Sequence, residues 1–236
     1  MSLIAPDPSQ PTASVAAMPP TPVTPKPPRT TTVTPRGLAA YEPGPLDDDL
    51  ESVELVEVDL GDADLDGRTV SGCLLRRCAL DGADLGRARV VESVLEGCEA
   101  AHLRVARSAW RDVVVDACRL GSVEAYETEW RGVRFEGTKV DYLNARAGTW
   151  RDVDLAGCRI GELDLTDAKV ERLRLDGCTV GTLVVGHARL TDVDLRGARI
   201  DVVEGLTGLA GSWLTSEQLT LLAPALAAEL GIRISG

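Results

Sequence analysis

The sequence lacks the long apolar stretches of a membrane protein and the leader of a secreted one. No run of about 18 apolar residues, the length that a membrane span needs, occurs in its 236 residues. The N-terminal segment also has no cationic start followed by an apolar core of signal-peptide length. We therefore expect neither a membrane span nor a signal peptide.

Aromatic residues are scarce, at 3% of the chain with a single phenylalanine. Buried aromatic side chains usually supply much of the binding energy of a protein interface. An interface of this protein is therefore expected to depend more on charge and shape than on aromatic anchors.

Motifs for catalysis, cofactors and metals are missing as well. His102 and His187 lie far apart, and we find no CxxC pair, glycine-rich phosphate loop, Ser/His/Asp set or catalytic carboxylate pair. Residues 62–67 match the start of a calcium-binding EF-hand loop, but the twelfth position of that loop is Cys73 instead of glutamate. We predict no enzymatic activity, no cofactor and no metal site.

Proline is concentrated at one end of the chain. Residues 1–46 hold 12 of the 13 prolines and seven threonines. Because proline cannot donate a backbone hydrogen bond, such a segment does not form a helix interior or a strand ladder. We predict a disordered or polyproline-like tail. Three Thr-Pro dipeptides are candidate recognition or phosphorylation points: Thr21-Pro22, Thr24-Pro25 and Thr34-Pro35.

The chain has one dominant pattern: from Leu50 to Ile200, every fifth residue is apolar. Within this register, only Ala100, Ala125 and Ala145 are small. A period of five matches neither a helix nor a strand, so it indicates an internal repeat. The residue two before each apolar centre is mostly small or apolar, and all six cysteines take this position: Cys73, Cys78, Cys98, Cys118, Cys158 and Cys178.

Because the position two before each apolar centre is mostly small or apolar, we expect it to point inward, as the centre does. This placement of the cysteines has two consequences. We expect the thiols to fill the core as small apolar groups, with no metal or disulfide partner. Free buried thiols also favour a reducing compartment, so we expect a cytoplasmic protein.

The units at residues 63–67 and 83–87, with the sequences ADLDG and ADLGR, resemble the A(D/N)LXX signature of the pentapeptide repeat family. The resemblance covers 31 consecutive units, about two thirds of the chain. It implies an all-β fold, a right-handed quadrilateral β-helix.

A second, longer period supports this fold. Trp110, Trp130 and Trp150 recur at every twentieth position. Twenty positions are four units, so one coil has four sides and the 31 units make just under eight coils. Stacked coils pair their backbones at about 4.8 Å, so residues twenty positions apart become neighbours. We therefore expect the three tryptophans to form an internal or partly exposed ladder, not a stacking platform for sugars or bases. The residues that follow them form a basic, solvated column: Arg111, Arg131 and Arg151.

The last coil needs a cover, because its core and strand edges would otherwise be exposed. Thr215 and Gln218 have the spacing of a capping box, which predicts a helix start. Pro224 should kink this helix or begin a second one, and Gly231 is a suitable end. We predict a tail over residues 1–46, a β-helix over residues 47–204 and a helical cap over residues 205–236.

Charge is distributed unevenly around the predicted rod. Residues 47–204 carry 33 acidic and 21 basic side chains, a net charge of −12. The side centred on Leu65 and every twentieth residue after it holds ten acids and one base, Arg104, a net charge of −9. A basic column lies one corner away: Arg119, Lys139, Arg159 and Arg199. We predict that a partner binds the acidic residues of that side: Asp62, Asp64, Asp81, Asp84, Glu124, Asp141, Glu162, Asp164, Asp201 and Glu204.

The leading functional hypothesis is a non-catalytic scaffold that presents the charged faces of a β-helical rod to a protein partner. The alternative comes from the resemblance, because the family includes gyrase-binding proteins that are similar to B-form DNA in shape and charge. It implies a DNA mimic that binds DNA gyrase, modulates or protects that topoisomerase against quinolones, and dimerises through the C-terminal cap. Duplex DNA of comparable length carries about 22 charges, so the mimicry is partial.

Neither hypothesis predicts direct binding to nucleic acid or to a membrane. Whether the C-terminal segment dimerises or only caps the rod is an open alternative at this point.

Overall fold

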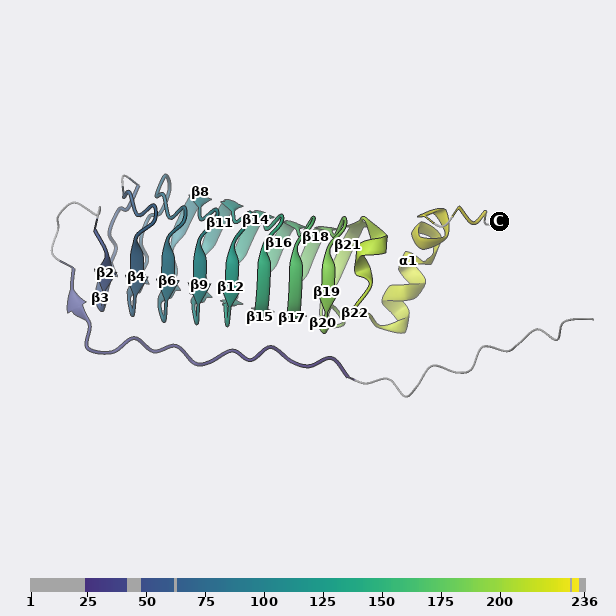
Figure 1. Ribbon diagram of the computed structural model, residues 1–236, viewed down its shortest axis with the longest axis horizontal. Helices are drawn as coiled ribbons and strands as arrows, with labels where there is room; N and C mark the ends of the chain where they lie inside the picture. Colours follow the sequence, from purple (N-terminus) through teal and green to yellow (C-terminus); the bar gives the residue numbers. More distant parts are fainter. Residues whose placement is uncertain (1–23, 42–47, 62, 230, 234–236) are drawn as a thin grey trace, which may run out of the picture.

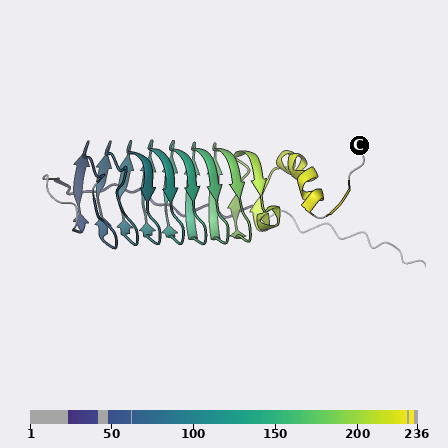
Figure 2. The same ribbon diagram turned by 90° about the horizontal axis from the view of Figure 1, so that it is seen from above.

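The computed structural model describes residues 24–41, 48–61, 63–229 and 231–233. Its main body is a rod of stacked strands, seen from two sides in Figures 1 and 2. The strands form a 16-stranded sheet, sheet A, and a six-stranded sheet, sheet B. Neighbouring strands pair in parallel, as expected when each coil stacks on the previous one.

Sheet A covers two adjacent sides of the rod. On the first side lie β2 (Leu50–Glu51), β4 (Thr69–Ser71), β6 (Arg89–Val91), β9 (Ala109–Arg111), β12 (Glu129–Arg131) and β19 (Arg189–Thr191). On the second lie β1 (Ala39–Ala40), β3 (Val53–Val56), β5 (Leu74–Arg76), β7 (Val94–Glu96), β10 (Val114–Asp116), β13 (Arg134–Glu136), β20 (Val193–Asp194) and β22 (Ser212–Trp213). Two longer strands cross both sides: β15 (Thr149–Ala156) and β17 (Lys169–Asp176).

Sheet B covers the remaining part of the rod surface with strands of six residues each. These are β8 (Glu99–Arg104), β11 (Arg119–Glu124), β14 (Lys139–Asn144), β16 (Arg159–Asp164), β18 (Thr179–Val184) and β21 (Arg199–Glu204). The first two coils join this surface only through isolated bridges, such as Asp64 with Asp84.

The strand register confirms the coil of four pentapeptide units. Trp130 pairs with Trp110 on one side and Trp150 on the other, and Leu143 pairs with Val123 and Leu163. The chain completes about eight turns of a parallel β-solenoid and ends in a single α-helix. The fold class predicted from the two sequence periods is therefore confirmed.

The corners of the rod are of two kinds. At three corners the backbone turns through a residue with positive φ, for example Arg107 (φ 59°), Asp112 (φ 53°) and Ala117 (φ 51°) in one coil. At the fourth corner the six-residue strands of sheet B continue around the bend. A left-handed conformation costs an L-residue about 1–2 kcal/mol, so the coil holds three strained corners and one relaxed corner.

The predicted inward positions are buried. All six cysteines are free and buried, and Trp110, Trp130 and Trp150 form an internal ladder. The ring centroid of Trp130 lies 5.3 Å from that of Trp110 and 4.4 Å from that of Trp150. The Trp150 indole N–H donates to the Thr128 hydroxyl at 3.2 Å. The prediction of an aromatic ladder inside the rod is confirmed.

The described part of the N-terminal segment lies along the rod. Residues 24–41 run extended beside sheet A from its C-terminal end to its N-terminal end (Figure 1). Strand β1 then adds to β3, so Ala39 pairs with Val53. The domain boundaries predicted at residues 46 and 204 stay predictions, and Thr21-Pro22 lies outside the described residues.

At the other end, a 3₁₀ turn, η1 (Leu206–Leu209), covers the last coil with the buried Leu206 and Leu209. The helix α1 (Ser216–Glu229) follows, and it contains Pro224 without starting a second helix. None of the residues of α1 is fully buried, but Leu222 and Leu226 are partly buried against the core, so α1 adds to the cover that η1 provides. Among the described helices, none has the length and apolar character of a membrane span.

The predicted start and end of α1 are confirmed. The Gln218 N–H donates to the Thr215 hydroxyl at 3.1 Å, and the Gln218 side-chain oxygen accepts from the Thr215 N–H at 2.8 Å. The Gln218 amide also donates to the carbonyls of Leu195 and Ala198 in the last coil, both at 2.9 Å. After the helix, Gly231 takes a positive φ of 71°.

Candidate interaction site

The predicted acidic residues lie together along one face of the rod. Nine of them are described and follow the outer surface of sheet B and the bridged coils before it, whereas Asp62 lies outside the described residues. The ladder register places Glu124, Asn144 and Asp164 in one column across β11, β14 and β16. We call this surface the acidic face.

Basic residues neutralise part of the acidic face. Four of its carboxylates form ion pairs: Asp84 with Arg104 (3.4 Å), Asp141 with Lys139 (2.9 Å), Asp164 with Arg146 (3.6 Å) and Asp201 with Arg199 (3.3 Å). Three of these bases, Lys139, Arg146 and Arg199, lie in columns next to the acidic side. The net charge of −9 counted for that side does not include them. The face therefore carries less net negative charge than its own columns indicate.

The other acidic residues of this face are less constrained. The Asp81 carboxylate accepts a hydrogen bond from the backbone N–H of His102 at 2.9 Å, and the Glu124 carboxylate lies 3.0 Å from the His102 ring nitrogen Nε2. In the described part of the chain, Asp64, Glu162 and Glu204 form no ion pair, although Asp64 accepts a backbone N–H.

Asp164 is an exception among these residues, because it is buried. The residue is 4% exposed, and its carboxylate accepts the Thr166 N–H at 2.9 Å and the Thr166 hydroxyl at 2.6 Å. A predicted partner-binding residue has to be exposed, whereas the structure covers the Asp164 side chain. Asp164 is therefore a structural residue at the edge of the acidic face.

A second surface was not found from the sequence. It is the corner between the two sides of sheet A, where a column of eight residues with positive φ follows the rod. We call this column the sheet A corner: Ser52, Gly72, Glu92, Asp112, Gly132, Asp152, Arg172 and Asp192.

The N-terminal segment lies over the sheet A corner. The Lys26 N–H and ammonium contact the Asp192 carboxylate at 3.5 and 3.7 Å. The Arg29 N–H donates to Asp152 at 2.9 Å, and the Thr31 hydroxyl donates to the Asp112 carboxylate at 3.1 Å. Three carboxylates, each two coils from the next, therefore hold one extended segment.

Asp152 is the most constrained of these carboxylates. Arg172, in the next coil, donates two hydrogen bonds to it at 2.6 and 2.9 Å, and both side chains are nearly buried. Burial raises the pKa of Asp152, but the hydrogen bonds from Arg172 and from the Arg29 N–H, with the charges of both arginines, outweigh burial and lower the pKa overall. Asp152 is therefore ionised wherever the protein is folded near neutral pH.

The predicted basic column lies beside the sheet A corner. Arg111 is 3.9 Å from Glu92, and Arg151 is 2.5 Å from Glu171. With Arg29 of the N-terminal segment, the column and the corner line one open cleft: Glu92, Arg111, Asp112, Arg131, Gly132, Arg151, Asp152 and Arg172. Acidic and basic side chains both line the cleft, so it differs from the solvated basic column that the sequence predicts.

The repeat that builds both surfaces can now be compared with known families. A model of pentapeptide repeats matches residues 54–97 with eight copies. The chain contains pentapeptide repeats. The register of the structure continues the same unit beyond the matched residues, through β21.

No curated protein matches this pentapeptide repeat chain. Among solved structures, a trypsin-treated variant of QnrB1, described as a plasmid-mediated fluoroquinolone resistance protein, is 16% identical with a TM-score of 0.33. The match covers 80% of this chain and 98% of that chain. Full-length QnrB1 is 14% identical with a TM-score of 0.27, and the match covers 80% of this chain and 99% of that chain.

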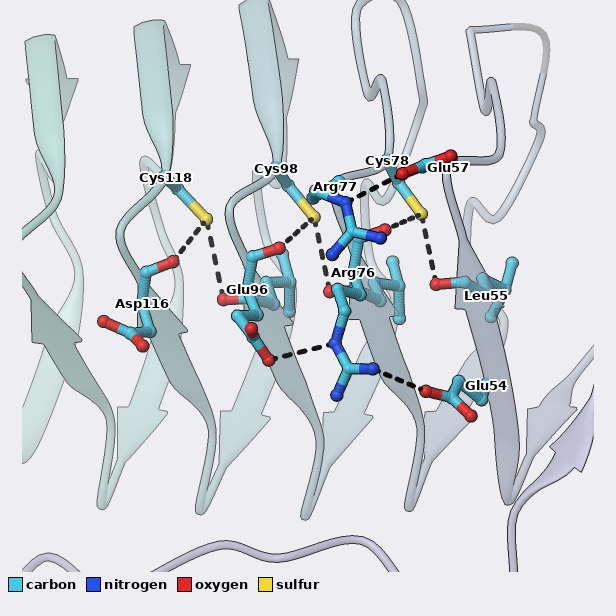
Figure 3. A network of polar contacts seen from close by, with 12 residues as sticks. Glu54, Leu55, Glu57, Arg76, Arg77, Cys78, Glu96, Cys98, Asp116 and Cys118 are labelled. Atoms are coloured by element: carbon cyan, nitrogen blue, oxygen red, sulfur yellow. Dashed lines mark hydrogen bonds and ion pairs between the residues drawn. The ribbon is translucent and has the colours of Figure 1, made fainter.

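The pentapeptide unit explains why cysteine recurs at one buried position of the coil. The thiols of Cys78, Cys98 and Cys118 donate to backbone carbonyls of their own and the preceding coil at 3.3–3.7 Å (Figure 3). Thr138 takes the same place in its coil with two hydroxyl bonds at 3.1 Å. The position that these cysteines and Thr138 share therefore suits a small side chain that can donate a hydrogen bond. Among the described residues, no group of side chains that could hold a metal ion occurs.

Proposed function

We propose that this pentapeptide repeat rod is a non-catalytic scaffold that binds a protein partner through the acidic face. The observation that carries the proposal is a sheet surface on which carboxylates recur in ladder columns, most of them exposed or half-buried. Such periodic charges steer and orient a partner with a complementary basic surface. The buried free thiols support a reducing, cytoplasmic setting for this scaffold.

The test compares two triple variants with the same change in charge. Asp84→Asn, Glu124→Gln and Glu162→Gln remove three charges from the acidic face. Glu57→Gln, Glu96→Gln and Glu136→Gln do the same on the second side of sheet A and at its adjoining corner, where these side chains are 37–67% exposed. Asp164 is left unchanged because it is buried.

The partner is sought with the full-length protein as bait, and its affinity for each variant is then measured by titration. We expect the acidic-face variant to lose at least tenfold in affinity and the control variant to keep it. Equal affinity for both variants contradicts the proposal.

A second candidate function is modulation of DNA gyrase by partial DNA mimicry. It is favoured by the carboxylates that follow the rod on one face, among them Asp64, Asp81, Glu124 and Glu162, and weakened by the four ion pairs on that face. Supercoiling assays with and without a fluoroquinolone test this function directly. No effect at micromolar excess of the protein eliminates it.

We also propose that α1 forms a homodimer contact. Leu219 and Leu221 are 51% and 76% exposed on this helix, and Ile232 after it is 56% exposed. Exposed leucines on a helix that buries none of its residues are typical of an interface that awaits a partner. Sedimentation of the chain and of a Leu219→Glu/Leu221→Glu variant tests this, and a native chain that sediments as a monomer contradicts it.

A further inference from the structure

The sheet A corner already holds a peptide, the protein's own residues 24–36. The contacts are made by the Lys26 and Arg29 backbones, the Lys26 ammonium and the Thr31 hydroxyl. Val33 and Pro35 are half-buried near small corner residues, and this part of the segment lines a cleft with Ser52 and Gly72. The corner is therefore a groove shaped to an extended chain.

The spacing of the contacts matches a polyproline II helix. Lys26 and Arg29 are three residues apart with Pro27 and Pro28 between them, which is one polyproline II turn of about 9.3 Å. Their acceptors, Asp192 and Asp152, are two coils apart, about 9.6 Å at the coil spacing. One turn of the segment therefore advances by the distance between successive corner carboxylates.

The charges of the groove and the segment are complementary. The three basic residues of positions 1–46 are Lys26, Arg29 and Arg36, and all of them fall within the docked segment. The groove offers carboxylates at Asp112, Asp152 and Asp192, whose backbone strain fixes their position at the corner. The Lys26 ammonium pairs with Asp192, whereas Arg29 binds Asp152 through its backbone N–H and adds its charge near that carboxylate. This arrangement fits a segment with a basic residue, two prolines and a second basic residue.

The docked segment makes few polar contacts with the groove, and only Pro25 in it is fully buried. The Lys26 side chain is 72% exposed, and most residues between 24 and 36 are exposed or half-buried. Its advantage over another peptide is mainly its tether, which gives an effective concentration of about millimolar. A peptide of the same chemistry on another protein can therefore replace it.

We propose that the sheet A corner is a recognition groove for basic, proline-rich segments of other proteins with two basic residues three positions apart. The chain's own residues 24–36 occupy this groove in the absence of a partner and compete with it. This groove is separate from the acidic face, so the two proposals stand or fall independently.

The test uses the full-length protein and a fluorescent peptide with the sequence of residues 24–36. A Lys26→Glu/Arg29→Glu variant repels its own segment from the corner carboxylates and leaves the rod unchanged. We expect the labelled peptide to bind this variant at least tenfold more tightly than the native protein, measured by fluorescence anisotropy. No saturable binding to the variant overturns the proposal.

Two controls separate groove recognition from general attraction to an acidic protein. Adding Asp112→Asn and Asp192→Asn to the variant should abolish binding, and asparagine accepts the left-handed backbone at both positions. Adding Asp141→Asn and Asp201→Asn on the acidic face should leave binding unchanged. Equal losses in both cases overturn the proposal.

A third arm tests the spacing rule. A peptide of the same composition in which the lysine and the arginine are adjacent keeps the charge but loses the match to successive carboxylates. We expect it to bind at least tenfold more weakly than the native sequence. Equal binding of the two peptides overturns recognition by spacing.

Discussion

Two corners of the rod are built by the same repeat and have opposite properties. At the sheet A corner, the backbone is strained, Asp152 and Arg172 are nearly buried and the chain's own segment lies over them. At the sheet B corner, the strands continue around the bend and charged side chains such as Asp141 and Asp201 stay exposed. Both corners carry carboxylates, so they differ in backbone conformation and in the cover that the N-terminal segment provides.

This difference shows how a solenoid can vary its surfaces without changing its core. Every coil keeps its apolar centres inside, because each coil is stabilised mainly by its neighbours. Outward residues are free to differ, so carboxylates form a groove at one corner and an open face at another. Changes at the two corners should therefore have different effects on stability.

The largest effect is expected from Asp152→Ala. The substitution leaves the nearly buried Arg172 with only its bond to Glu171, without the two hydrogen bonds to Asp152, and we expect the free energy of unfolding to fall by about 3 kcal/mol. Guanidinium titration of the full-length protein measures it. The matched control is Asp141→Ala, which breaks an exposed pair with Lys139 and should change stability little. Equal losses would show that the two corners do not differ as described.

A smaller loss is expected from Asp164→Ala at the edge of the acidic face. The substitution removes a buried acceptor and leaves the Thr166 N–H and hydroxyl without this partner, at a cost of about 2 kcal/mol. Asp201→Ala, where the side chain is 52% exposed, serves as the control. A loss at Asp201 as large as at Asp164 would contradict the burial of Asp164 as the cause.

The docked segment should respond to acid in a defined pH window. Because the folded-state pKa of Asp152 is lowered, its carboxylate stabilises the folded state above the ordinary aspartate pKa of about 3.9. That contribution is lost only as the pH falls through the lowered value. We expect the NMR signal of the Arg29 amide to stay constant from neutral pH to about pH 4 and to shift below it. A shift between pH 5 and 6 would falsify Asp152 as the anchor.

The two sequence periods, the pentapeptide and the coil of four such units, predicted the solenoid, the buried cysteines and the tryptophan ladder, because burial repeats in every unit. The docking of residues 24–36 has no such signal, since Arg29 and Asp152 are 123 residues apart. The charge of the acidic face was overestimated because Arg146 and Lys139 reach it from neighbouring columns. The spacing of Lys26 and Arg29 could have predicted the docking only if it had been compared with the spacing of the corner carboxylates.

The smallest effect is expected from an alanine-to-glycine substitution, made once at a strained corner and once at the relaxed corner. Ala147 has a φ of 54°, so Ala147→Gly relieves left-handed strain, and after the entropy cost of glycine we expect a gain of about 0.5–1 kcal/mol. Ala101 lies in β8 where the strand rounds the sheet B corner, so Ala101→Gly should cost about 0.5–1 kcal/mol. Both side chains are exposed, which removes packing as a cause. Guanidinium titrations that give the same sign for both variants would contradict the division into strained and relaxed corners.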